Sequence, residues 1–531
     1  MTSKLEVEWQ FEAPDLDVVE QWATEQTARH GVKVDPASRV IEHDSYFDTQ
    51  DWRFFRAGCA LRVRRAGDVS TATLKTFGQR RDGAHQRIEI SEPVALPRRT
   101  SAAGLIKALT ALPGPVGERI RLVCRDVALT ALFSARAERR LSDVRLDGST
   151  VAELALDTVA MTGGAKRSPL IVSRVELEAR GEPLPILQTL ADALRDDLGL
   201  SPAGESKYEL GLKLAGLHPT LAPFCGSPAS AAELAETERK PSIGALAYAV
   251  MRERFAQFSA NEPGTRLGDD PEFVHDMRTA TRRLRAAMGL FEPFLPHRAI
   301  ALRDGLRWFA TQLGAVRDID VQLEHLTHGQ DGIALVDGAD AVIGLLRAQR
   351  EQARLALLRA IDSPRYTQLL AAFEEMLRAG PRRADAIHRQ AADAMPAMIE
   401  ARYRKVNKAF GRLGPDSPPQ DYHALRILIK RFRYALEFAE PLFGKPISDY
   451  LPVVVGAQET LGGYQDAEVA LAHLRALSLS PEALSTPATL LALSEMSRQR
   501  ILQGEALRAR APEEIGALTG KAWRRLKKGM R

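Results

Sequence analysis

Three short stretches decide the fold of the first part of this chain: LEVEW at residues 5–9, ALRVR at residues 60–64 and RVELE at residues 174–178. Each carries two like charges separated by one apolar residue. The paired charges are Glu6 and Glu8, Arg62 and Arg64, and Glu176 and Glu178. Alternate residues of a β-strand share one face, so each pair lies on one face and the apolar residue between them points the other way. Faces rich in carboxylates beside faces rich in guanidinium groups predict the polar inside of a closed barrel.

Such a barrel would bring together the groups that bind a multiply charged phosphate compound. Carboxylate oxygens suit Mg²⁺ or Mn²⁺, and Arg and Lys side chains suit phosphate oxygens. Phosphoryl transfer needs positioning, charge neutralisation and an oriented water more than covalent help from the protein. Further charged residues fall in strand-like runs: Lys75, Arg87, Glu89, Glu153 and Asp157. A solvated outer face explains any single pair, but it does not explain strands of opposite sign side by side.

Length and composition indicate a multidomain globular protein. A chain of 531 residues with 45% hydrophobic residues is too long for one core, so we expect two or three domains. The start MTSKLEVEWQ lacks the basic and apolar regions of a signal peptide, and we see no apolar run that could span a membrane. The three cysteines are widely spaced and form neither a disulfide framework nor a zinc pattern. We therefore expect a cytoplasmic protein without a membrane partner.

The chain divides into two parts of different character. Residues 1–215 alternate strand-like and helical patterns and predict an α+β domain. Residues 216–240 are rich in Pro, Ser, Ala and Gly and predict a linker. Residues 241–531 read as helical throughout, and they hold 41 Lys and Arg against 34 Asp and Glu. The basic excess of the chain therefore lies in this all-α half and suggests a polyanionic partner.

An internal repeat organises the helical half. VHDMRTATRRLRAAMGLFEPFL contains His275 and is followed by LGAVRDIDV; YHALRILIKRFRYALEFAEPLF contains His423 and is followed by LGGYQDAEV. The spacing between the two motifs is the same in both copies, which predicts a duplicated helical bundle with copies at about 241–385 and 386–531.

Each copy predicts a basic stripe along one helix, because offsets of 0, 3, 7 and 10 residues fall on one side of an α-helix. The stripes and their flanking residues are His275, Arg278, Arg282, Arg283 and Arg285 in the first copy, and His423, Arg426, Lys430, Arg431 and Arg433 in the second. An ordinary solvated face is the alternative interpretation of such a stripe. Asp318 and Asp466 occupy equivalent repeat positions, and we expect them to anchor some of these arginines. The histidines fit either a ligand-binding role or a satisfied place in the core.

The first half resembles the CYTH domains, the triphosphate tunnel metalloenzymes. The resemblance covers about residues 3–213 and rests on an ordered set of motifs: E-x-E at Glu6–Glu8, YFDT at 46–49, LRVR at 61–64, TLKT at 73–76, HQRIEI at 85–90, LALD at 154–157, VELE at 175–178 and SKY at 206–208. It implies an eight-stranded antiparallel tunnel that hydrolyses or cyclises triphosphates with Mg²⁺ or Mn²⁺. The implied metal ligands are Glu6, Glu8, Asp157, Glu176 and Glu178. The implied phosphate-binding residues are Arg62, Arg64, Lys75, Arg87, Lys207 and one or both of Arg139 and Arg140. Glu6, Glu8 and Glu89 are the carboxylates that the resemblance assigns to catalysis, Glu89 either at the metals or in a water network.

One position departs from the family pattern. The motif E-x-E-x-K ends in Gln10 here, which keeps a hydrogen-bond donor but loses the positive charge. A tunnel that binds without turnover is therefore one alternative, and a tunnel enzyme for another triphosphate, such as thiamine triphosphate or ATP for cyclisation, is a second.

The second half, about residues 241–531, resembles the CHAD domain, a duplicated helical module. The resemblance implies two four-helix halves that bind inorganic polyphosphate in a basic groove between them. Few aromatic side chains accompany the basic helices, so we do not expect nucleic acid as the partner. We therefore expect a cytoplasmic protein of the kind found largely in bacteria as CYTH–CHAD fusions, a metal-dependent inorganic triphosphatase coupled to polyphosphate, including polyphosphate granules. The oligomeric state stays open.

Overall fold

The computed structural model describes residues 4–530 except 26, 98–99, 165–168, 220–228, 329–337, 382–384, 415 and 485. The chain forms two compact units. The first holds Met1–Leu221 with Pro263–Asp269, and the second holds Ala222–Glu262 with Asp270–Arg531. Part of the predicted linker, 220–228, lies outside the described residues. Another part is a helix, α7 (Ala231–Thr237), which begins at a Ser230 cap.

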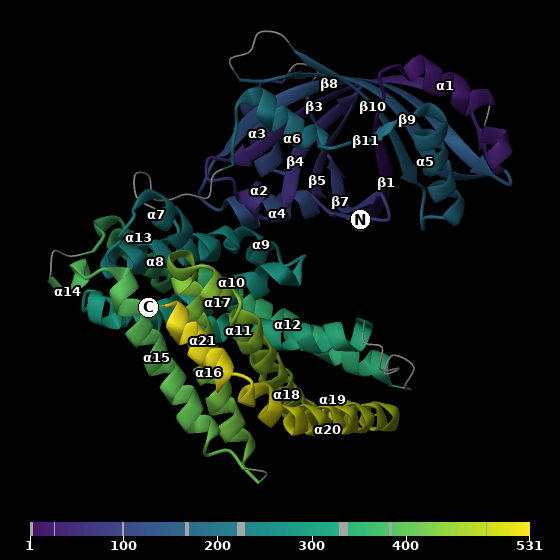
Figure 1. The fold of residues 1–531 in the computed structure, drawn as a ribbon. Helices are drawn as coiled ribbons and strands as arrows, with labels where there is room; N and C mark the ends of the chain where they lie inside the picture. Colours follow the sequence, from purple (N-terminus) through teal and green to yellow (C-terminus); the bar gives the residue numbers. More distant parts are fainter. Residues whose placement is uncertain are drawn as a thin grey trace. The chain divides into compact units, whose positions relative to one another are not determined.

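The first unit is built on a closed antiparallel barrel of eight strands (Figure 1). Strand β1 pairs with β10 on one side and with β7 on the other, which closes the sheet without a free edge. The barrel strands are β1 (Lys4–Glu12), β3 (Ser38–Thr49), β4 (Cys59–Ala66), β5 (Val69–Thr76), β7 (Ala84–Pro93), β8 (Leu129–Leu146), β9 (Ser149–Thr162) and β10 (Leu170–Ala179). Short strands β2 (Lys33–Val34), β6 (Gln79–Arg81) and β11 (Ser201–Pro202) pair at its margins. The predicted eight-stranded tunnel is confirmed.

Tight turns set the register of two hairpins in this unit. Asp82–Gly83 joins β6 to β7 and Asp147–Gly148 joins β8 to β9, and all four residues have positive φ. This conformation matches the twist of a two-residue hairpin, which favours the Asp-Gly sequence at both places.

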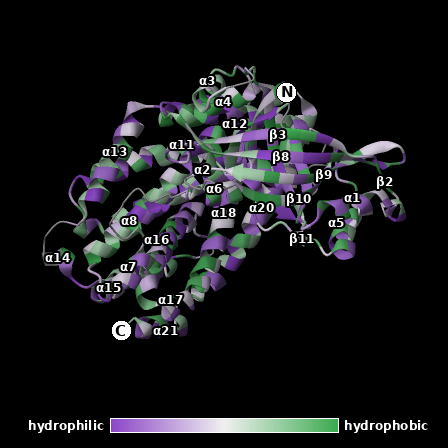
Figure 2. Cartoon of the chain, turned by 90° about the horizontal axis from the view of Figure 1, so that it is seen from above, coloured by the Kyte–Doolittle hydropathy of each residue, from purple (hydrophilic) through white to green (hydrophobic). Residues whose placement is uncertain are grey.

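The apolar faces of the strands point outward, where helices cover them. Val7, Trp9 and Phe11 of β1 pack with residues of α1 (Leu16–Glu25) and α5 (Pro185–Leu198). On other strands, Leu61 and Leu74 pack with residues of α3 (Ala102–Thr110) and α4 (Pro115–Cys124). Figure 2 shows hydrophilic and hydrophobic residues alternating along β3 and β8. The hydrophobic core therefore surrounds the barrel, and the lumen is left to the charged faces.

The second unit consists of helices that repeat at an offset of 148 residues, as the sequence predicts. The first copy has α8 (Ile243–Ala260), α10 (Pro271–Leu290), α11 (Ala299–His328) and α12 (Ala339–Ile361); the second has α15 (Ala391–Phe410), α16 (Pro419–Phe443), α18 (Leu451–Ser478) and α20 (Pro487–Gly516). One large apolar cluster joins residues of both copies. The two four-helix halves are therefore confirmed, and they share a continuous core.

The remaining elements complete the two units. They are η1 (Thr27–His30), α2 (Arg53–Arg56), α6 (Lys207–Ala215), α9 (Glu262–Leu267), η2 (Glu292–Phe294), α13 (Pro364–Ala379), α14 (Asp385–His388), α17 (Lys445–Ser448), α19 (Pro481–Leu484) and α21 (Lys521–Gly529). Among the helices in the described ranges, none combines the length and apolar character needed to cross a bilayer.

A buried carboxylate holds the turn after β3, which gives the first testable prediction. Asp48 is fully buried and accepts hydrogen bonds from the backbone N–H groups of Thr49, Phe54 and Phe55 at 2.7, 2.9 and 2.9 Å. Asp48→Ala leaves these donors without an acceptor and should destabilise the barrel unit by on the order of 3 kcal/mol. Hydrogen–deuterium exchange of residues 47–60 in the full chain measures the effect.

Asp51→Ala is the matched control on the same segment. The side chain of Asp51 is 44% exposed and pairs with Arg53, so its loss should cost less than about 1 kcal/mol. Equal protection of residues 47–60 in the two variants would contradict the assigned role of Asp48.

Candidate functional site: a charged barrel lumen and a basic helical groove

The barrel lumen encloses a cavity of about 680 Å³ lined by charged side chains from β1, β3, β4, β5, β7, β8, β9, β10 and α6. In the described part of the chain, nine Lys or Arg residues and eight Glu residues line it. The near balance of the two signs means that the lumen is suited neither to an anion alone nor to a cation alone.

Strand β1 supplies the first carboxylates of the lumen. Glu6 and Glu8 are buried, and both contact cations from neighbouring strands. Lys75 Nζ lies 2.6 Å from Glu6 Oε2 and 3.8 Å from Glu8 Oε1, and Arg87 pairs with both glutamates. The predicted metal-binding and phosphate-binding residues are thus directly paired with each other.

Gln10 connects β1 to β10. Its Nε2 donates to Glu8 Oε1 at 2.9 Å and to Glu176 Oε1 at 3.1 Å. The amide therefore bridges two carboxylates by hydrogen bonds, as a lysine at this position would, but adds no positive charge.

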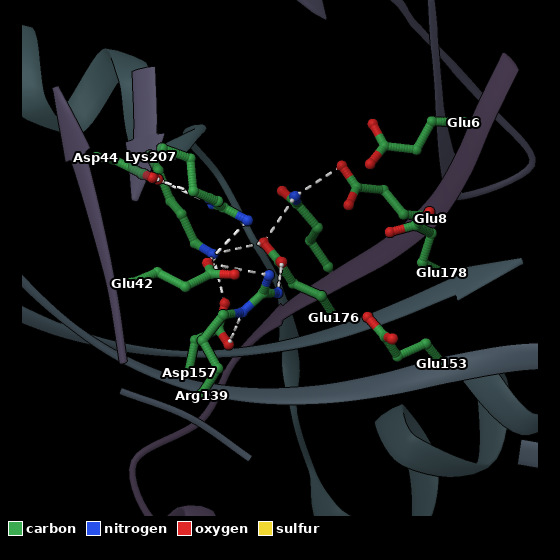
Figure 3. Close-up of polar contacts among 12 residues, drawn as sticks. Glu6, Glu8, Glu42, Asp44, Arg139, Glu153, Asp157, Glu176, Glu178 and Lys207 are labelled. Atoms are coloured by element: carbon green, nitrogen blue, oxygen red, sulfur yellow. Dashed lines mark hydrogen bonds and ion pairs between the residues drawn. The ribbon is translucent and has the colours of Figure 1, made fainter. Parts of the chain in front are cut away.

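A second cluster lies where β8, β9 and α6 meet (Figure 3). Arg139 donates to Asp157 at 2.7 Å and to Glu176 at 3.0 Å. Lys207 pairs with the same two carboxylates, 3.1 Å from Glu176. A capping box between Ser206 and Glu209 begins α6 and fixes Lys207 in its first turn. The SKY motif thus places a lysine in the lumen, in the first turn of α6.

Two acids of β3 complete the lumen, and the sequence analysis missed them. Asp44 forms a two-point ion pair with Arg64 at 2.9 and 2.8 Å and lies 3.5 Å from Arg62. Glu42 pairs with Arg64 at 2.8 Å. The same alternating spacing, read within VIEHDSYFDT, would have identified both acids.

The cations keep the lumen carboxylates ionised. Burial opposes ionisation of Glu176, but Lys207 and Arg139 outweigh it and hold the pKa of Glu176 well below its usual range. Burial likewise opposes ionisation of Asp44, and Arg62 and Arg64 hold that pKa well below its usual range.

Neighbouring cations lower the pKa of Glu89 as well. Burial favours its neutral form, yet Arg62 and Lys75 lower its pKa, and Ser91 donates a hydrogen bond at 2.9 Å. Glu89 is therefore ionised at neutral pH and accepts hydrogen bonds rather than donating a proton.

The donor chemistry of the lumen fits a divalent cation. Among the residues that the structure describes, no three His, Cys, Asp or Glu side chains already stand as a metal-ligand cluster. However, Glu6 and Glu8 share Lys75 and Arg87, and Glu8 and Glu176 share the amide of Gln10. Three carboxylates thus converge on shared donors, and their hard oxygens are the ligands that Mg²⁺ and Mn²⁺ prefer.

Of the adjacent residues Arg139 and Arg140, only Arg139 belongs to the lumen. Arg140 points to the outer face of β8, where it pairs with Asp17 at 2.5 Å and Glu20 at 2.6 Å on α1. Neighbouring residues of a strand point to opposite faces, so only Arg139 can bind a phosphate in the lumen. Glu178 does line the lumen and pairs with Lys4 at 2.5 Å.

In the second unit, helices α10 and α16 bring the two predicted stripes together. Arg282 Nε donates to Tyr434 Oη at 2.6 Å across the two helices. Two cavities of about 770 and 850 Å³ share five lining residues and form one groove. The shared residues are Arg278, Arg282, His423, Arg426 and Lys430. We call this continuous surface the basic groove.

The acids of the repeat anchor some of the groove arginines, as predicted. Asp318 lies 3.3 Å from Arg278, and Asp466 lies 3.6 Å from Arg426 at the equivalent place. His423 is held by Gln465 at 2.7 Å. Burial and then the charge of Arg317 lower the pKa of His275.

Lys430 is the most perturbed cation of the groove. Burial, together with the neighbouring Arg426 and Arg282, lowers its pKa to about 7. Burial and the neighbouring cations of the groove therefore both disfavour the charged form of Lys430.

Two predicted residues lie elsewhere, and others were missed. Arg283 and Arg433 both pair with Glu437, at 3.5 and 2.6 Å, and line neither cavity of the groove. His275, Arg285 and Arg431 do line it, and so do residues not predicted for it: Arg303, Arg307 and Arg317 of α11, and Arg500 of α20. Arg402 of α15 also lines it, and here the sequence did give a signal, because the basic segment ARYRKVNKAFGR offers cations that could extend such a groove. Arg317 lies within the repeated motif LGAVRDIDV. The others lie outside the repeated motifs, so their place depends on the tertiary packing.

Comparisons with known proteins agree with this architecture. The CYTH domain model matches residues 5–208, and the CHAD domain model matches residues 249–475. No curated protein matches the chain in a sequence comparison.

Several solved structures are similar to one half of the chain. The CHAD domain of the plant Ricinus communis is 29% identical, covering 53% of this chain and 93% of that chain, with a TM-score of 0.46. PptA from Streptomyces chartreusis is 21% identical, covering 52% and 99%, with a TM-score of 0.43. HpAC1 from Hippeastrum, described as having a dominant triphosphatase activity, is 16% identical, covering 41% and 97%, with a TM-score of 0.28.

The two family models cover the barrel and the helical repeat in the order in which they occur along the chain. This protein therefore belongs to the CYTH–CHAD fusion proteins, with a CYTH tunnel domain followed by a CHAD domain.

Proposed function

We propose that the CYTH domain hydrolyses inorganic triphosphate with Mg²⁺ or Mn²⁺, and that the CHAD domain binds inorganic polyphosphate. One observation carries the first part: buried carboxylates and buried cations pair with each other around a closed cavity. A purely structural network of this size would be a costly choice, because well-packed apolar residues stabilise a barrel at least as well as buried ion pairs.

The lumen cations act on the substrate. Arg62, Arg64, Lys75, Arg87, Arg139 and Lys207 line the cavity and present N–H donors toward it. Bound triphosphate would take over these donors from the carboxylates, so anion binding releases the acids from their ion pairs. Charge-assisted hydrogen bonds from Arg would fix the phosphates in line and stabilise the charge that develops on them.

The released carboxylates would hold the metal. Glu6, Glu8 and Glu176 are the central ligands, with Asp157 and Glu178 beside them. A bound divalent cation supplies charge neutralisation for the phosphates and lowers the pKa of its water. Glu89, ionised and hydrogen-bonded to Ser91, is placed to orient a water molecule.

Gln10 bears on the choice between turnover and binding alone. Its amide already makes the two hydrogen bonds that join Glu8 to Glu176, so it keeps the acids in place without a charge. We therefore favour an active tunnel over a degenerate one. Cyclisation of ATP and hydrolysis of thiamine triphosphate are the other reactions that this lumen could support.

The basic groove supports the second part of the proposal. It is long, shared by both repeats and lined by cations that lower one another's affinity for protons. A flexible polyanion without bases matches such a surface, since the groove presents positive charge but few aromatic rings for stacking. We propose a cytoplasmic location, which includes polyphosphate granules. By binding polyphosphate, the groove would keep the enzyme at these granules.

The tunnel proposal predicts metal-dependent release of phosphate. The purified protein should release phosphate from inorganic triphosphate with Mg²⁺ or Mn²⁺, and EDTA should abolish the release. Glu6→Gln removes a metal ligand and should lower kcat about 100-fold or more, since the metal contributes several kcal/mol of charge stabilisation. Pyrophosphate and long-chain polyphosphate serve as comparison substrates in the same assay. No release from any substrate, with polyphosphate binding intact, would instead establish a binding protein with an inactive tunnel.

Adjacent arginines provide a matched pair for the phosphate-binding role. Arg139→Gln should lower kcat/KM for triphosphate about 10- to 100-fold, because it removes a charged donor from the lumen. Arg140→Gln should change kcat/KM less than about twofold, because Arg140 contacts only the outer helix α1. Thermal melting of each variant separates a loss of binding from a loss of fold. Equal kinetic effects of the two changes would contradict the assignment of faces.

The groove predicts a pH-dependent affinity for polyphosphate. The free protein has Lys430 with a pKa of about 7, and a bound polyanion raises that pKa. Lys430 is already charged below pH 7, so its contribution to affinity should be flat there; above pH 7 binding must take up a proton, so affinity should fall by up to about tenfold per pH unit. Fluorescence anisotropy with labelled long-chain polyphosphate at constant ionic strength measures this dependence.

Lys430→Arg is the decisive control, because arginine stays charged across this range. The variant should bind with little dependence on pH between 7 and 9, whereas Lys445→Arg, a change outside the groove, should keep the wild-type slope. A wild-type slope in Lys430→Arg would show that another group titrates.

A further inference from the structure

A third cavity of the second unit opens beside the basic groove and is mainly apolar. It has a volume of about 640 Å³ and lies where the end of α10, the turn at η2, the start of α11 and helix α15 meet. Most of the described residues that line it are apolar, among them Met288, Leu295, Ile300 and Met398. Sites for small molecules usually have volumes of about 300–1,000 Å³, so this cavity is large enough to hold one. We call it the apolar pocket.

Two prolines shape one wall of the apolar pocket. Pro293 and Pro296 in FEPFLP, residues 291–296, both lack a backbone N–H, so a regular helix is unfavourable there. The segment forms the short turn η2 between α10 and α11 instead. The equivalent segment of the second copy, AEPLFG at residues 439–444, has a single proline, Pro441, and helix α16 continues through it. The wall of the pocket is therefore a feature of the first copy.

The repeat-equivalent pair of helices carries a helix of its own. Helices α8 and α16 are the equivalents of α15 and α10, and α7 packs against both of them. Val250 of α8 is 1% exposed, whereas its equivalent on α15, Met398, is only partly buried. Likewise, Glu253 is partly buried, whereas its equivalent Ala401 is exposed. The fold thus covers this pair of helices in one copy and, within the described residues, leaves an apolar pocket on it in the other.

Cations without acidic partners line the apolar pocket. Arg402 donates a hydrogen bond to the carbonyl of Gly289 at 2.9 Å, and it lines both the pocket and the basic groove. In the described part of the chain, neither Arg402 nor Lys405 has a carboxylate within ion-pair distance, whereas Arg303 pairs with Glu292 at 2.5 Å. Apolar walls beside unpaired cations are complementary to a molecule with an apolar chain and an anionic head.

We propose that the apolar pocket binds a free, single-chain anionic amphiphile. Its alkyl chain would lie against Ile300 and Met398, and its phosphate or carboxylate head would meet Arg402 and Lys405. The proposal is independent of the triphosphatase and polyphosphate-binding functions, because it concerns a separate cavity and a different class of ligand.

The rim of the apolar pocket favours a free molecule over a lipid within a bilayer. Among the described residues that line it, Ile300 is the most exposed large apolar residue, at 39%. Glu292, His297 and Lys405 are exposed beside it. Proteins that lie on a bilayer present a broad apolar face to it, which this mixed rim lacks. The ligand therefore enters from solution.

Calorimetric titration of the full protein with octyl, decyl and dodecyl phosphate, below their critical micelle concentrations, tests the proposal. Affinity should rise by up to about fourfold for each CH₂ group that the pocket buries. Methyl phosphate has the same head without a chain and reports on binding by the basic groove alone. It should bind at least about 100-fold more weakly than dodecyl phosphate.

Two matched pairs of variants locate the binding. Ile300→Glu places a carboxylate in the apolar wall and should lower the affinity for dodecyl phosphate about tenfold or more, with a flatter chain-length series. Leu491→Glu, on a leucine of α20 that is 69% exposed and lines none of these three cavities, should leave both unchanged. Lys405→Gln should lower the affinity about three- to tenfold, and Lys408→Gln, on the same helix but outside the pocket, should not. Thermal melting of each variant confirms that the fold is kept.

Three results would overturn the proposal. The first is a chain-length series that is the same in Ile300→Glu and in the wild type, or an affinity for dodecyl phosphate no higher than that for methyl phosphate. The second is Ile300-dependent binding to phosphatidylglycerol vesicles without binding of monomeric dodecyl phosphate, which would make the pocket a membrane contact. The third is tighter binding of a synthetic peptide of residues 229–240, which contains α7, than of dodecyl phosphate, which would assign the pocket to a protein helix.

Discussion

Closure of the barrel is the constraint on which the rest of the tunnel depends. Because β1 pairs with both β10 and β7, the sheet closes on itself. Each strand then has one face toward the lumen and one toward the outside, and the charged faces point toward the lumen. The helices outside bury the apolar faces and complete a core that surrounds the lumen. A lumen of charges is stable only if each charge is paired, and the alternation of acidic and basic strands provides this pairing. The same pairs contain the residues that we propose bind triphosphate and a divalent cation.

The two domains treat anions by different electrostatic means. In the tunnel, carboxylates pair with the cations, and these cations hold the pKa values of Glu176 and Asp44 well below their usual range. In the basic groove, acids such as Asp318 and Asp466 pair with only some of the cations, and burial together with the neighbouring Arg426 and Arg282 lowers the pKa of Lys430. Under the proposed function, the tunnel would position a short substrate, and the groove would hold a long polyanion.

Much of this could be predicted from sequence because two periodicities carry the information. Spacing of two residues assigned Glu6, Glu8, Glu176 and Glu178 to one side of their strands, and the offset of 148 residues located equivalent helices in both repeats. Other features depend on partners distant in the chain. Arg139 and Arg140 are indistinguishable until the strand register is known. Arg283 and Arg433 pair with Glu437 instead of lining the groove, and Arg303 lines it from a part of α11 that lies before the repeated motif. Asp44 is different, because Glu42 and Asp44 occupy alternate positions of VIEHDSYFDT and the sequence pattern alone contains both.

We propose that the ion-paired residues of the lumen form the substrate site, and that the ion pairs are its state before substrate binds. A crystal structure of the protein with inorganic triphosphate and Mn²⁺, read with the anomalous signal of manganese, tests it most directly. The account predicts triphosphate in the lumen against Lys75, Arg87 and Lys207, a manganese peak on Glu6, Glu8 and Glu176, and the ion pairs between these two groups opened. Unchanged ion pairs in the lumen, with triphosphate and manganese found only in the basic groove, would contradict it.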